Sequence, residues 1–142
     1  MFVTLSAKIG ALLMAAICLY AAWPGARPQR WAALAVFVAW VGSAALQDRA
    51  NSVDPEYAIF ALDLAAAAVF MAMALGWRRV WLMAIAGLQL LTTATHVAVM
   101  IDLRIWDYAY LTAYLVWSYL LLAALAWGGA EAWRERSGRS RR

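Results

Sequence analysis

The sequence predicts an all-α membrane protein, a bundle of about five transmembrane helices. Of its 142 residues, 67% are hydrophobic and 14% are charged, and the mean hydropathy is +0.70. Soluble chains are about 45–50% apolar and about 25% charged, so a water-soluble domain could not bury this much apolar surface. The apolar runs are continuous and do not alternate every second residue. They therefore favour helices over the strands of a membrane barrel.

The first two expected spans cover residues 5–23 and 31–47. A signal peptide is the alternative for the first, because Lys8 precedes an apolar core. That segment is long enough to span, so we expect it to be retained as a helix. The second is about 25 Å long at 1.5 Å per residue, which is short for a ~30 Å hydrocarbon core. We expect it either to extend at one end or to end in a polar vestibule.

The remaining expected spans cover residues 57–77, 80–102 and 106–127. The link between the third and the fourth is so short that it predicts an antiparallel hairpin, with Gly76 in the left-handed cap conformation. Gly128 and Gly129 are expected to end the fifth span. Residues 1–130 then form a single membrane domain, and residues 131–142 form a basic cytoplasmic tail.

The distribution of basic residues predicts the orientation of the bundle. Arg27, Arg30, Arg78, Arg79 and the tail arginines fall on one side, whereas Lys8, Arg49, Arg104 and most loop acids fall on the other. The positive-inside rule then places the amino terminus outside and the carboxyl terminus in the cytoplasm. Tryptophans near the predicted span ends fit an aromatic belt at the bilayer surface: they are Trp23, Trp31, Trp77, Trp81, Trp106 and Trp127.

A small set of polar residues interrupts the predicted spans. Asp63 and the only histidine, His96, both lie roughly 10 Å from the outer ends of their helices, so a hairpin brings them nearly level. Polar groups at this depth are costly and indicate functional sites. The predicted intramembrane cluster consists of Asp63, Gln89, Thr92, Thr93, His96, Tyr114 and Ser118. With Ser43 and Gln47 of the second span, it would line an outward-facing polar vestibule.

Each cluster member also has a structural interpretation. His96 could hydrogen-bond Asp63 or Thr92 and lock two helices together. It could instead relay protons, contact a ligand, or bind a pigment as the one candidate cofactor ligand. Thr92 and Thr93 are expected to bond to their own helix backbone, and the tyrosine stripe that contains Tyr114 is typical of packing.

Residue counts exclude several kinds of site within one chain. Cys18, Lys8 and His96 are each the only residue of their type. There is therefore no intramolecular disulfide, no four-ligand zinc site and no bis-histidine haem. A retinal Schiff base at mid-membrane has no lysine to form it. No metal site is predicted, and no nucleophile, base and orienting group can be recognised as a catalytic set.

The succession AGLQLL, TH, DLR, AY and WSYLLLAALA resembles a group of small uncharacterised proteobacterial polytopic inner-membrane proteins that have no assigned activity. The resemblance covers roughly residues 58–130 and implies a location in the bacterial inner membrane and a helical fold. The residues that it singles out are Gln89, Thr95, His96, Asp102, Trp117, Ser118 and Tyr119.

Three functions are compatible with these observations. The leading one is a non-catalytic accessory or assembly subunit that packs against itself or against other membrane subunits. The second is proton, ion or small-solute transport through a vestibule at Asp63 and His96. The third is binding of bacteriochlorophyll, haem or quinone through His96. The lipid bilayer is an expected partner and nucleic acid is not, because five of the twelve basic residues lie in the last nine positions.

Overall fold

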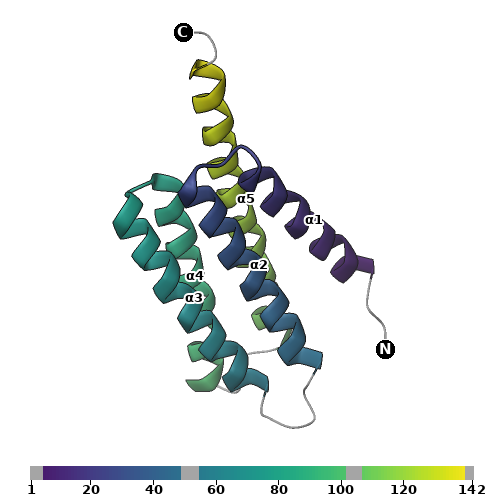
Figure 1. Ribbon diagram of the computed structural model, residues 1–142. Helices are drawn as coiled ribbons and strands as arrows, with labels where there is room; N and C mark the ends of the chain where they lie inside the picture. The colour runs from purple at the N-terminus through teal and green to yellow at the C-terminus, as the bar shows by residue number, and fades with distance from the viewer. Residues whose placement is uncertain (1–4, 49–54, 102–106, 140–142) are drawn as a thin grey trace.

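The computed structural model describes residues 5–48, 55–101 and 107–139. These residues form five α-helices: α1 (Leu5–Ala22), α2 (Arg27–Asp48), α3 (Pro55–Trp77), α4 (Val80–Ile101) and α5 (Asp107–Arg139). The prediction of an all-α fold is confirmed. Consecutive helices alternate in direction, α1 leans away from the bundle towards its amino end, and α5 projects beyond the other helices (Figure 1).

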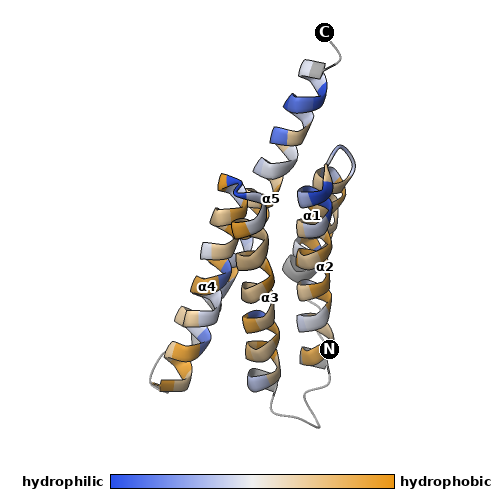
Figure 2. Cartoon of the chain, turned by 60° about the vertical axis from the view of Figure 1, so that its left-hand side comes forward, coloured by the Kyte–Doolittle hydropathy of each residue, from blue (hydrophilic) through white to orange (hydrophobic). Residues whose placement is uncertain are grey.

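Four helical segments are long and apolar enough to cross a membrane: Arg27–Leu46, Tyr57–Trp77, Val80–Ile101 and Thr112–Gly138. The apolar part of α1, Lys8–Ala22, is shorter. Large apolar side chains point outwards from these helices, as lipid contact requires; Leu12, Leu75 and Ile101 are examples. Figure 2 shows apolar residues along the bundle and hydrophilic ones on the projecting end of α5. The fold is compatible with an integral membrane protein.

The apolar core lies around α4. Trp81, Leu82 and Ile85 are fully buried on its first two turns, and they pack in one cluster with Phe70 of α3 and Leu125 of α5. Trp81, Leu82 and Ile85 lie on one side of α4, because positions three and four apart share a helix face. These fully buried residues lie near the end of the bundle at which α3 passes into α4.

α2 begins at Arg27, four residues before the expected start at Trp31. Pro28 explains the difference, because its fixed φ suits the first helical turn and its missing N–H would have no partner there. The basic connector is correspondingly short, and Gln29 belongs to the helix and is buried.

The α3–α4 turn forms as a hairpin, but Gly76 does not take the left-handed conformation. Arg78 does so, with φ of 50°, and its N–H donates to the Ala74 carbonyl at 2.9 Å. The helix continues to Trp77, one residue beyond the glycine, so the cap position falls on an arginine. Left-handed φ is uncommon for a residue that carries a Cβ.

Gly128 and Gly129 do not end α5; the expectation that they would is wrong, because the helix continues to Arg139. Both glycines are buried where another helix approaches closely. A Cβ on Gly128 would lie 2.6 Å from the Trp81 ring, and one on Gly129 would lie 2.8 Å from the Tyr20 ring. The glycines therefore permit contact between helices.

The tryptophan pattern is also partly different from the expected belt. Trp23, Trp31 and Trp77 are exposed near helix ends, as a membrane interface requires. Trp127 is also exposed, but it lies within α5, which continues to Arg139. Trp81 is fully buried beneath Gly128 and belongs to the core. Trp106 lies outside the described residues.

Candidate functional site

Asp63 is the centre of a buried polar network between α3 and α4. The residue is buried, with only 4% of its surface exposed. Gln89 Nε2 donates to Asp63 Oδ1 at 2.9 Å, and His96 Nε2 lies 2.9 Å from Asp63 Oδ2. Each carboxylate oxygen thus has a partner on α4, which is the condition under which a carboxylate can be buried at tolerable cost.

The spacing along α4 explains why two residues reach one carboxylate. Gln89 and His96 are seven positions apart, which is two helical turns, so they share a face. Asp63 lies between their levels on the neighbouring helix, and Gln89 Nε2 also lies 3.4 Å from the Asp63 carbonyl oxygen. All three residues are buried. The network therefore joins α3 to α4.

Two aromatic rings flank the imidazole of His96. Tyr114 of α5 approaches it edge-on with ring centroids 5.8 Å apart, and Phe60 of α3 does so at 6.3 Å. Ser43 of α2 hydrogen-bonds the Tyr114 side chain. Polar and aromatic groups from four helices, α2 to α5, consequently meet around His96.

The other residues of the predicted cluster bond within their own helices. The Thr92, Thr93 and Ser118 hydroxyls donate to the carbonyl oxygens of the residues four positions earlier, Leu88, Gln89 and Tyr114, at 3.1, 3.0 and 2.8 Å. Such bonds within one helix satisfy a hydroxyl without linking it to a neighbour. The structure brings together Asp63, Gln89, His96 and Tyr114 of the predicted set.

Sequence reasoning missed the part played by Phe60, because an apolar residue in an apolar span carries no distinguishing signal. The sequence predicted that Ser43 lines the polar vestibule, but it did not predict a hydrogen-bond partner for Ser43. The Gln47 side chain lies outside the described part of the chain. Asp102, one of the residues that the family resemblance singles out, also lies outside it. Thr95 of that set donates to the Leu91 carbonyl at 2.8 Å.

A second polar contact lies at the opposite end of the bundle. Arg79, in the α3–α4 turn, contacts Glu131 at 2.5 Å and Glu135 at 3.0 Å, and these two residues lie one turn apart on α5. The hydrogen bond to Glu135 is the largest of the effects that raise the pKa of Arg79 above its ordinary value. Its guanidinium therefore remains charged throughout the neutral range.

Little in the described residues favours a bound metal. They contain no group of three or more His, Cys, Asp or Glu side chains placed to hold one. A haem or bacteriochlorophyll on His96 would have to use Nδ1, or compete with Asp63 for Nε2. In metal sites a carboxylate often fixes one ring nitrogen of a histidine while the other nitrogen binds the metal.

No protein-family model, curated protein or solved structure matches the chain.

Proposed function

We propose that the chain is a non-catalytic accessory or assembly subunit of a larger or homo-oligomeric membrane complex. The observation that carries the proposal is the continuation of α5 past the bundle as an ordered helix. Residues 129–139 extend about 16 Å beyond Gly128 at 1.5 Å per residue. A helix that is already ordered loses less conformational entropy when a partner binds to it.

Two contacts support this projecting segment from different sides. Arg79 binds Glu131 and Glu135, and the Tyr20 ring of α1 stacks on Trp133 with centroids 6.5 Å apart. The outward residues Arg134, Arg136 and Ser137 are exposed. A partner would therefore meet a fixed helix surface on which arginines are presented.

We also propose an orientation for the chain and the membrane in which it lies. The projecting end of α5 carries the arginine-rich terminus, and Arg27, Arg30, Arg78 and Arg79 lie at that end of the bundle. The positive-inside rule assigns such an end to the cytoplasm. We place the chain in the bacterial inner membrane, with its amino terminus outside and with membrane subunits as partners.

Photocrosslinking in native membranes tests the assembly role. A photoreactive amino acid in place of Ser137 should give defined adducts heavier than the 15.7 kDa chain. The same amino acid in place of Leu12, which is 71% exposed on α1, is the matched control and should give no discrete protein adduct. A monomer that forms no adduct from Ser137 and purifies without any other subunit would contradict the proposal.

Proton conduction is the second candidate, and the buried Asp63–His96 contact favours it. Acid–imidazole pairs within membranes occur in proton relays, and Tyr114 and Ser43 extend the polar path across α5 and α2. Proteoliposomes that hold the native chain should then dissipate a pH gradient, and Asp63→Asn or His96→Ala should abolish the flux. Flux that survives both substitutions would eliminate this function.

A further inference from the structure

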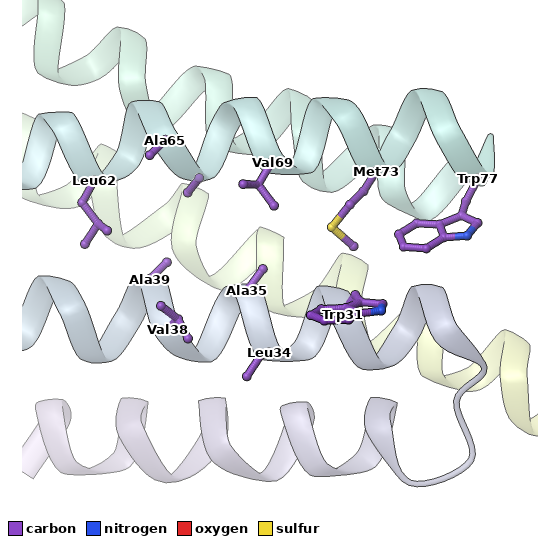
Figure 3. A pocket seen from close by; sticks show the side chains of 11 residues that line it. Trp31, Leu34, Ala35, Val38, Ala39, Leu62, Ala65, Val69, Met73 and Trp77 are labelled. Atoms are coloured by element: carbon purple, nitrogen blue, oxygen red, sulfur yellow. The ribbon is translucent and has the colours of Figure 1, made fainter.

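An apolar groove of about 480 Å³ lies between α2 and α3 (Figure 3). Its eleven lining residues are all apolar. They recur every three or four positions on both helices, so one face of each helix forms one wall. Ala35 and Ala39 on α2 and Ala65 and Ala66 on α3 leave the space between the helices open, because their side chains end at Cβ.

One end of the groove has the character of a membrane interface. Trp31 and Trp77 line it there, and they are 56% and 38% exposed. Arg27 precedes Trp31 by one turn on the same face of α2, and Arg78 follows Trp77 directly; both arginines are exposed. Tryptophan is typical of the headgroup level, and guanidinium groups bind phosphate oxygens strongly.

The length of the groove suits a hydrocarbon chain. From Leu62 to Trp77 it runs about 22 Å, which exceeds the ~15 Å that one leaflet contributes to the hydrocarbon core. The groove is therefore long enough to take a whole acyl chain from the headgroup level inwards.

We propose that the groove binds one acyl chain of an anionic diacyl phospholipid, whose phosphate is held by Arg27 and Arg78. The apolar walls take the chain, the tryptophans lie at the level of the glycerol, and the arginines neutralise the headgroup. This inference does not rest on the assembly role, because it needs only α2, α3 and the turn that follows α3.

Lipid selectivity measured by spin-label spectroscopy tests the proposal. The full chain is placed in phosphatidylcholine vesicles that contain spin-labelled phosphatidylglycerol or spin-labelled phosphatidylcholine with identical chains. The native chain should immobilise the phosphatidylglycerol probe preferentially. Arg27→Gln and Arg78→Gln should each reduce that preference by up to about fivefold, whereas Arg134→Gln combined with Arg136→Gln should leave it unchanged.

A second set of variants tests the groove itself. Ala65→Phe and Val69→Phe should abolish the immobilisation of both lipid probes in the groove. Both positions are exposed on the α3 wall of the groove, so a phenylalanine ring at either position would fill it. Ala68→Phe, also exposed on α3 but outside the groove, is the control. Circular dichroism verifies that the variants remain helical.

Three results would overturn the proposal. The native chain could immobilise both probes equally, or the preference for phosphatidylglycerol could persist when Arg27 and Arg78 are both replaced by glutamine. Alternatively, Ala65→Phe could leave lipid binding intact and dissociate an oligomer. The last result would show that a second copy of the chain, and not a lipid, covers the groove.

Discussion

Asp63 shows how a single residue joins two helices in an apolar protein. An ionised carboxylate in a low-dielectric interior is costly unless each oxygen is paired, and here Gln89 and His96 supply one partner each. Between membrane helices the apolar surface provides little specificity, since lipid tails are as apolar as leucine. The Asp63 network can therefore fix the register of α3 against α4, which hydrocarbon packing alone would define poorly.

A double-mutant cycle at Asp63 and His96 measures this interaction. Each of Asp63→Ala and His96→Ala should lower the free energy of unfolding by about 1–3 kcal/mol, because a buried polar partner loses its hydrogen bond. The double variant should cost about 1 kcal/mol less than the sum of the two. Unfolding in mixed detergent micelles provides the measurement.

Thr95→Ala is the control for this cycle. Its hydroxyl bonds only to the backbone of its own helix among the contacts described, so the substitution should change stability little. Strict additivity of Asp63→Ala and His96→Ala would show that their contact contributes nothing to the fold.

Helix ends depend on contacts that lie far away in the sequence. The glycine pair Gly128 and Gly129 is typical of a helix end. Both residues are nevertheless interior positions of α5, because Trp81 and Tyr20 pack against them. Gly76 is the residue type expected at a left-handed helix cap, yet Arg78 adopts that conformation. A glycine can serve at a helix end or at a close approach between helices, and its own sequence context does not distinguish the two.

Two alanine substitutions distinguish these roles of glycine. Gly128→Ala should destabilise the bundle, because the new Cβ would lie 2.6 Å from the buried Trp81 ring. Gly87→Ala, at an α4 position with open space around it, should stabilise by about 0.5–1 kcal/mol through helix propensity. Thermal unfolding in detergent compares the two, and equal effects would show that Gly128 is not a contact position.

The contact of Arg79 with α5 should matter for local order more than for overall stability. Arg79→Gln should cost less than about 1 kcal/mol, because the pair is partly exposed. Hydrogen exchange in residues 129–139 should nevertheless become faster. Because the pKa of Arg79 is raised, its contribution is complete below the ordinary arginine pKa and is lost only above it, so neutral pH should have no effect through this group.

Arg30→Gln, at an exposed position on α2, is the matched control and should leave exchange in α5 unchanged. High salt should reproduce part of the Arg79→Gln effect by screening. Unaltered exchange in Arg79→Gln would mean that Arg79 does not order the projecting segment.

At the scale of the whole molecule, hydropathy was sufficient to predict the helical class, the order of the helices and the α3–α4 hairpin. Counting residues along the two helices also predicted that Asp63 and His96 are nearly level, and their side chains do meet, at 2.9 Å. Helix rotation is marked by a polar face only on α4, where Gln89, Thr92, Thr93 and His96 lie on the buried side together with Trp81. The largely apolar α3 has no such face, so the contacts of Phe60 could not be predicted.

If α3, α4 and α5 each cross the bilayer, the Asp63 network and the Arg79 contact lie towards opposite membrane surfaces. The most direct test is maleimide labelling of Tyr57→Cys and Gly138→Cys, two exposed positions, in spheroplasts before and after permeabilisation. Cys18 is buried, so the unsubstituted chain is the background control. Tyr57→Cys should label in intact spheroplasts and Gly138→Cys only after permeabilisation. Labelling of both positions from the same side would contradict the account.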